Sequence, residues 1–159
     1  MIYDEIAMNN GVIFLRAFDI LKERMQQAIN CGVQGGNVLS GKSALDASLF
    51  VPIVVNGSLA CELFMKSMLP QRKKIHKLDE LFALLDNDLQ EKIRQSTIAE
   101  MKKRNTAYGE TEFQNDLDGN NDIFVEWRYF HEGNSHPVNY QFVDAFLKSI
   151  FTVVNEERK

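Results

Sequence analysis

A long apolar segment in the first half of the chain constrains the fold most strongly. Between residues 44 and 69 the sequence is almost entirely apolar, over 49–55 and again over 59–69. A helix that is apolar on most sides must be surrounded by other elements, so this segment predicts the buried centre of a helical bundle. Pro52 and Gly57 interrupt the run, and we expect a kink or a short break there.

Segments with helical spacing of apolar residues surround this predicted centre. They predict five further helices, at residues 4–30, 78–85, 89–104, 123–132 and 140–154. Gly11 is expected to delay or bend the first of them. No segment shows strand alternation over a convincing length. We therefore predict a single all-α domain over residues 1–159, most simply an antiparallel bundle of five or six helices.

Two stretches between these segments are expected to be irregular. Residues 31–42 hold four glycines and predict a loop. Residues 105–121 carry Asn, Gly and Asp with few large apolar side chains. They predict a connection with one helical turn around Phe113.

Charge and composition limit the classes of function that the chain can have. The net charge of −4 argues against a surface built wholly for nucleic acid, although a local basic site remains possible at residues 72–74 or 102–104. No basic segment leads into a long apolar run, and no unbroken apolar stretch is long enough for a membrane span. Cys31 and Cys61 lack metal-ligand spacing and predict reduced thiols in a cytoplasmic protein without metal or cofactor.

Residues 36–43 match the phosphate-loop pattern G-x-x-x-x-G-K-[ST] at every fixed position. In a true phosphate loop Lys42 would reach the terminal phosphates and Ser43 would bind magnesium. That chemistry requires a buried strand before the loop, and residues 23–30 are polar and helically spaced instead. We therefore expect a glycine-rich connection that binds neither ATP nor GTP.

The segment Trp127-Arg128-Tyr129-Phe130-His131-Glu132 is the richest in chemistry. Arg128, His131 and Glu132 stand at i, i+3 and i+4, so they share one side of a helix. One interpretation is an Arg128–Glu132 helix pair beside a hydrogen-bonded core histidine. The other is a functional site, to which Asn134 and His136 in the following loop could contribute.

Three more polar residues accompany the apolar helix. Glu62 stands one turn before Lys66. We expect Glu62 either to form a local ion pair with Lys66 or to pair with Arg128 across the bundle. His76 precedes a leucine-rich segment and is expected either to close the turn through backbone hydrogen bonds or to join the site.

The order of these motifs resembles the HEPN superfamily of small helical-bundle proteins. The motifs are an apolar helix with Pro, then E-L-x-x-K at Glu62, H-x-L-x-x-L at His76 and W-R-Y-x-x-E at Trp127, and the resemblance covers roughly residues 44–150. It implies a HEPN-like bundle, usually dimeric, from a bacterial or phage defence or toxin–antitoxin setting. Many such proteins are RNases that need no metal.

The resemblance also implies roles for the candidate residues. Arg128 would contact phosphate, with His131 or His136 as the base. The remaining candidates would orient the arginine or bind substrate: Glu62, Lys66, His76, Glu132 and Asn134. HEPN RNases place four to six residues between arginine and histidine, whereas here two precede His131 and seven precede His136. Two functions therefore stay open: an RNA-binding or RNA-cleaving protein, and a non-catalytic dimerisation module that binds a protein partner.

Aromatic residues are dense near the C-terminus and predict more apolar surface than one core needs. They are Phe124, Trp127, Tyr129, Phe130, Tyr140, Phe142, Phe146 and Phe151. Exposed apolar patches usually mark interfaces, so we expect a homodimer.

Overall fold

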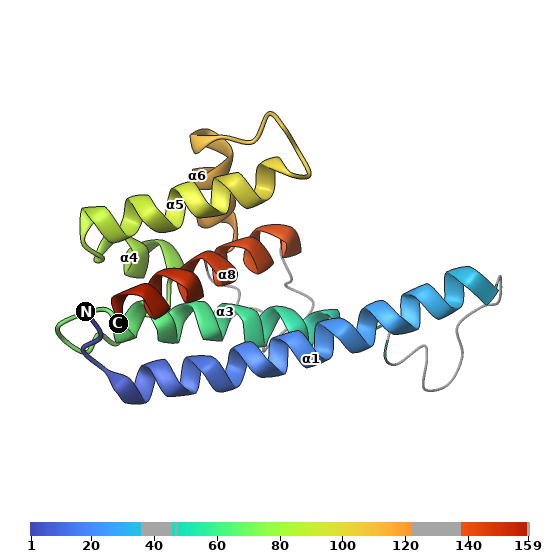
Figure 1. The fold of residues 1–159 in the computed structure, drawn as a ribbon, viewed down its shortest axis with the longest axis horizontal. Coiled ribbons are helices and arrows are strands. Elements are labelled where there is room, and N and C mark those ends of the chain that lie inside the picture. The colour runs from blue at the N-terminus through green and yellow to red at the C-terminus, as the bar shows by residue number, and fades with distance from the viewer. Residues whose placement is uncertain (36–45, 47, 122–137, 159) are drawn as a thin grey trace.

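A computed structural model describes residues 1–35, 46, 48–121 and 138–158 of the chain (Figure 1). Within those ranges the backbone forms helices and no strand, which confirms the all-α prediction. The helices are α1 (Glu5–Gly35), α3 (Phe50–Ser67), α4 (Leu78–Ala83), α5 (Asn87–Lys102), α6 (Glu110–Gly119) and α8 (Tyr140–Glu157).

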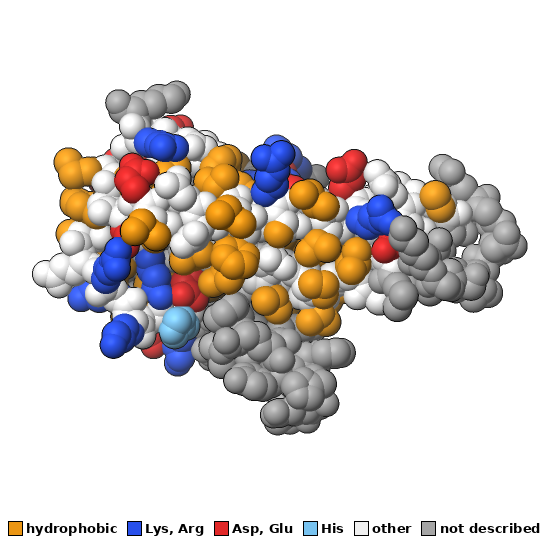
Figure 2. All heavy atoms as spheres, turned by 90° about the horizontal axis from the view of Figure 1, so that it is seen from below, with side chains coloured by type: hydrophobic (Ala, Val, Ile, Leu, Met, Phe, Trp, Pro, Cys, Tyr) orange, Lys and Arg blue, Asp and Glu red, His pale blue; other side chains and the backbone are white. Residues whose placement is uncertain are grey.

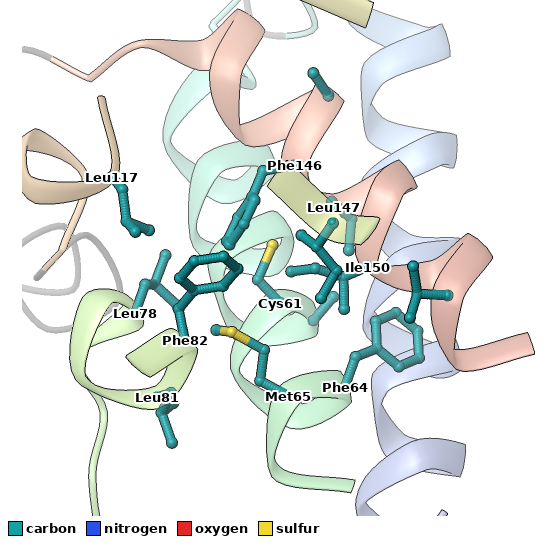
Figure 3. Close-up of a cluster of buried hydrophobic side chains, with 14 of the residues drawn as sticks. Cys61, Phe64, Met65, Leu78, Leu81, Phe82, Leu117, Phe146, Leu147 and Ile150 are labelled. Carbon is teal, nitrogen blue, oxygen red and sulfur yellow. The ribbon is translucent and has the colours of Figure 1, made fainter. Parts of the chain in front are cut away.

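Helix α3 occupies the centre, as the apolar run predicts. Figure 1 shows α1 along one side of α3 and α8 along another, with α5 packed on the far side of α8. Most buried apolar side chains of the described residues form one continuous cluster. Figure 3 shows its middle, where side chains of α3, α4, α6 and α8 converge around Phe82 and Phe146.

The helix directions differ from a simple antiparallel bundle. Helix α1 runs antiparallel to α3, and α5 runs antiparallel to α8 (Figure 1). Helices α3 and α8 lie side by side and run in the same direction. The expected antiparallel arrangement therefore describes two of the helix pairs and not the central one.

Helix α1 begins at Glu5 and continues through Gly11, so the expectation that this glycine delays the helix was wrong. Helix α3 continues through Gly57 and begins at Phe50, after a turn at residues 48 and 49. Pro52 lies in the first turn of α3, where a backbone N–H has no partner within the helix. A Cβ on Gly11 would lie 2.7 Å from Phe64 Cδ1, and one on Gly57 would lie 2.9 Å from Phe18 Cδ2. Each glycine of the α1–α3 pair thus receives a phenylalanine ring of the other helix.

Two stretches expected to be irregular are partly helical. Helix α1 continues through residues 31–35, and the rest of that predicted loop, with the phosphate-loop match, lies outside the described residues. Helix α6 replaces the connection predicted around Phe113. It forms because Phe113 is buried against Phe82 and Phe142, with ring centroids 5.7 and 5.8 Å away.

Helix α8 is fixed to the rest of the bundle by polar contacts and by its aromatic residues. Asn139 caps it by accepting a hydrogen bond from the Phe142 N–H at 3.1 Å. Asp144 accepts a hydrogen bond from Lys22 of α1 at 2.8 Å. Phe142 and Phe146 are fully buried inside this chain, so these two do not supply the exposed aromatic surface on which the dimer expectation was based.

Candidate functional site

Glu62 is the centre of a buried polar cluster. Helix α3 carries Glu62 and Lys66 one turn apart, and Lys66 Nζ donates to Glu62 Oε1 at 2.7 Å. The local ion pair expected from their spacing is therefore confirmed. Glu62 is only 3% exposed although it carries a carboxyl group. A carboxylate this deeply buried is stable only with close donors.

His76 supplies the second donor from a different part of the chain. After α3 the backbone returns past the helix end, and His76 Nδ1 lies 3.0 Å from the same oxygen of Glu62. A carboxylate oxygen only accepts hydrogen bonds, so the ring proton lies on Nδ1 when Glu62 is ionised. The expectation that His76 bonds only to backbone groups was therefore incomplete. The ring is held by a side chain 14 residues earlier in the sequence.

The two oxygens of the Glu62 carboxylate differ in their hydrogen bonding. Glu62 Oε2 is buried and accepts no hydrogen bond from any described residue. Glu62, Lys66 and His76, which we call the Glu62 cluster, thus share one carboxylate oxygen. The alternative partner proposed for Glu62, Arg128, lies outside the described residues.

A cleft of about 250 Å³ lies beside this cluster, between the first turns of α1 and the end of α3. Lys66, Arg72 and Lys73 contribute positive charge to its lining, and Asp4 contributes negative charge. Asp4 accepts hydrogen bonds from the Ala7 N–H at 3.0 Å and from Arg72 Nε at 2.9 Å. These donors, the Ala7 N–H foremost, hold the pKa of Asp4 below its usual range.

The segment between α3 and α4, residues 70–77, is the basic loop of the following argument. It exposes Arg72, Lys73, Lys74 and Lys77. Figure 2 shows Lys and Arg side chains gathered near the pale blue histidine at the end of the molecule where α1 begins. Lys73 and Lys74 form no ion pair within the described part of the chain.

The second basic cluster, residues 102–104, lies at the opposite end of the bundle, where α5 ends (Figure 1). There Lys103 pairs with Glu100 of the same helix. Only the basic loop therefore adjoins the Glu62 cluster.

The structure brings together the three described members of the predicted site, Glu62, Lys66 and His76. The other predicted site residues lie outside the described residues: Arg128, His131, Glu132, Asn134 and His136. Within the described ranges, no three His, Cys, Asp or Glu side chains converge as metal ligands.

Sequence reasoning missed the contribution of Asp4 and Arg72. An aspartate just before a helix is a typical N-cap, so the role of Asp4 at the start of α1 had a signal in the sequence. Its partner Arg72 is 68 residues away, and nothing in the sequence joins the two.

Helix α3 is long and apolar enough by composition to cross a membrane, with a mean hydropathy of 1.2. In the bundle 56% of it is buried, and a central core helix meets the same criterion. Its composition therefore carries no argument for a membrane span.

Comparison of the chain with protein-family models, with curated proteins and with solved structures found no significant match.

Proposed function

We propose that this chain is a HEPN-like protein that binds RNA, with the basic loop contacting backbone phosphates. The observation that carries the proposal is the contact between His76 and buried Glu62, because it fixes the end of a loop that exposes four cationic side chains. Cations held in place on a rigid scaffold are the usual means of contacting a phosphate backbone.

The charges of this loop are only partly neutralised by the protein itself. Arg72 pairs with Asp4 at 2.9 Å, and Lys77 lies 3.7 Å from Glu80. Lys73 and Lys74 have no carboxylate partner among the described residues. The loop is therefore locally positive on a chain whose net charge is −4.

The Glu62 cluster has an orienting role in this proposal. Because Nδ1 of His76 lies 3.0 Å from Glu62 Oε1, the buried carboxylate holds the imidazole ring in one orientation. The side chain of His76 is 54% exposed and stands within the same loop as the lysines. In this proposal Glu62 and His76 fix the end of the basic loop and so hold the neighbouring lysines in place.

The resemblance to HEPN proteins adds a catalytic hypothesis and a cytoplasmic defence or toxin–antitoxin setting. In this hypothesis Arg128 stabilises the charge on a phosphate, with His131 or His136 as the base. Cleavage of single-stranded RNA in the presence of EDTA, lost in Arg128→Ala, would support it. If the wild-type protein cleaves no RNA, the catalytic hypothesis is wrong and only the proposed RNA binding remains.

Binding is tested by fluorescence anisotropy with a labelled, unstructured single-stranded RNA across a range of salt concentrations. Lys73→Ala/Lys74→Ala should weaken binding and lower the slope of log K against log salt by roughly 0.7 per lost phosphate contact. The matched control, Lys102→Ala/Arg104→Ala, removes the same charge at the opposite end of the bundle and should change binding little.

Two results would contradict this assignment. Wild-type protein that does not bind RNA at low salt would exclude RNA binding by this surface. Equal weakening by the two double variants would show that net charge, rather than the basic loop, governs binding.

A dimerisation module that binds a protein partner is the second candidate function. It is favoured by one observation, a row of exposed isoleucines on α1 that consists of Ile6, Ile13 and Ile20. Size-exclusion chromatography with light scattering on the purified chain tests the dimer directly.

A further inference from the structure

The cleft beside the Glu62 cluster has cationic and apolar side chains in one lining. The cations are Lys66, Arg72 and Lys73, and the apolar residues are Ile6, Ala7 and Leu63. Figure 2 shows Lys, Arg and apolar side chains side by side at this end of the molecule, near the histidine. A cleft with this lining fits an anionic group attached to a less polar part, because both kinds of contact lie within one volume of about 250 Å³.

Two of the cations are held in place by carboxylates and still have donors to spare. Lys66 is only 17% exposed and donates to Glu62 Oε1 at 2.7 Å, which leaves further N–H groups on its ammonium. Arg72 donates to Asp4 through Nε at 2.9 Å. Its terminal nitrogens, Nη1 and Nη2, form no hydrogen bond with a described residue. A guanidinium fixed through Nε presents this remaining pair of donors to the oxygens of a phosphate.

The carboxylate in the cleft lining, Asp4, is already occupied by the protein. Its Oδ1 accepts hydrogen bonds from the Ile6 N–H at 3.1 Å and the Ala7 N–H at 3.0 Å. Its Oδ2 accepts the bond from Arg72. Asp4 therefore caps α1 and orients Arg72. Lys73 forms no ion pair within the described part of the chain, so the cleft keeps an excess of positive charge.

We propose that this cleft binds the terminal phosphate of an RNA strand, a phosphate monoester at its 5′ or 3′ end. The inference rests on the proposed RNA binding and specifies which part of the RNA is recognised. A terminal phosphate has three free oxygens and a charge of about −1.5 to −2 at neutral pH. It can therefore use all three cationic groups of the lining, whereas an internal phosphodiester offers fewer free oxygens and a smaller charge.

The rest of the basic loop provides contacts for the nucleotides that follow. Lys74 and Lys77 are exposed and lie outside the cleft lining, so they are available to internal phosphates. Ile6 and Leu63 in the lining can pack against the sugar or base of the terminal nucleotide. The loop thus contacts the strand at its end and along its backbone.

Competition against a labelled RNA with hydroxyl ends tests the inference by fluorescence anisotropy. The unlabelled competitors share one unstructured sequence and carry hydroxyl ends, a 5′-phosphate or a 3′-phosphate. One of the two phosphorylated strands should compete on the order of tenfold better than the hydroxyl strand, because it gains charge-assisted hydrogen bonds. The matched control is a hydroxyl strand that is one nucleotide longer. It adds one internal phosphate in place of the terminal one and should gain much less.

Variants of the full chain locate the preference. Arg72→Gln should reduce the tenfold preference to nearly none. Its ion pair is at the surface, with Arg72 79% exposed, so the fold should persist. Lys73→Gln, the second variant, should also lose the preference. Lys74→Gln removes the same charge from the same loop outside the cleft lining. It should weaken binding of all strands and leave their ratio unchanged.

Free phosphate monoesters are the other source of the same chemical group. AMP and inorganic phosphate should displace the labelled RNA only at far higher concentrations than the phosphorylated strand, because they make no contact with the rest of the basic loop. If AMP competes as well as the phosphorylated strand, the cleft serves a free nucleotide and its assignment to an RNA end is wrong.

The failure of this inference can be distinguished from the failure of RNA binding. A wild type that binds RNA but gains no more from a terminal phosphate than from one more internal phosphate would overturn the terminal-phosphate site alone. A preference that survives both Arg72→Gln and Lys73→Gln would also overturn it. A wild type that binds none of the strands would overturn RNA binding itself, and the site with it.

Discussion

Replacing Gly11 with alanine tests how α1 and α3 fit together. A Cβ at this position would lie 2.7 Å from both Cδ1 and Cε1 of Phe64. Carbon atoms pack best at about 3.5–4.0 Å, so the ring or the helix must move by roughly 1 Å. Phe64 has no exposed surface and packs on Phe151 with a centroid distance of 5.4 Å, so the ring has little room.

Two opposing effects set the magnitude. Overpacking a well-filled core costs about 1–3 kcal/mol. Alanine in place of glycine within a helix stabilises the folded state by up to about 1 kcal/mol, because alanine has the higher helix propensity. The steric effect is larger, so Gly11→Ala should lower the free energy of unfolding by about 1–2 kcal/mol. For a chain of this size the melting temperature should fall by roughly 2–8 °C.

Chemical denaturation and thermal melting measure the effect, and the chain offers an internal control. A Cβ on Gly119, the last residue of α6, would have nothing within 4 Å. Gly119→Ala should therefore be neutral or stabilising by up to about 1 kcal/mol.

A double-mutant cycle with Phe64→Leu identifies the cause. On the Phe64→Leu background, which removes the ring, Gly11→Ala should cost much less or become stabilising. If Gly11→Ala is as stable as wild type, or if its cost is unchanged without the ring, the close fit between the helices is not what requires glycine here.

Further predictions concern titratable groups. Asp4→Ala should cost about 1 kcal/mol through loss of the α1 cap, whereas Asp4→Asn should retain most of the cap, as urea titration would show. Because the folded pKa of Asp4 is lowered, its contribution is complete above the unfolded value and should disappear as pH falls through the folded pKa, a dependence absent in Asp4→Asn. Burial raises the pKa of Cys61, so native protein should show one thiol, Cys31, that reacts rapidly with a thiol reagent, and the second only after unfolding. Burial raises the pKa of Tyr140 to about 12 and also raises that of Tyr108, so both should remain protonated in ultraviolet titration at pH 11. Their stabilisation is complete below the unfolded pKa and is lost as pH rises toward the folded values.

Among the described residues, regular apolar spacing in the sequence correctly predicted the helical segments, whereas the helix predicted at residues 123–132 lies outside them. The predicted helices at residues 4–30, 78–85, 89–104 and 140–154 correspond to α1, α4, α5 and α8. The composition of the apolar run likewise placed α3 at the centre, because a helix apolar on most sides has no other stable position.

Local propensity misjudged the glycines and the polar connection because it does not contain packing. Gly11 and Gly57 indicate weak helix in isolation, yet each provides the space that a phenylalanine of the neighbouring helix fills. Residues 110–119 are mostly polar, and only the burial of Phe113 and Leu117 makes a helix of them. Tertiary contacts overrode propensity in each case.

For the candidate site, the sequence alone determined the pair that lies within one helix. Glu62 and Lys66 are one turn apart, and their ion pair follows from helix geometry. The contacts of His76 with Glu62 and of Arg72 with Asp4 join residues 14 and 68 positions apart. Only the tertiary structure decided these, because a helix has a fixed repeat whereas the return of the chain after α3 depends on the packing of the whole bundle.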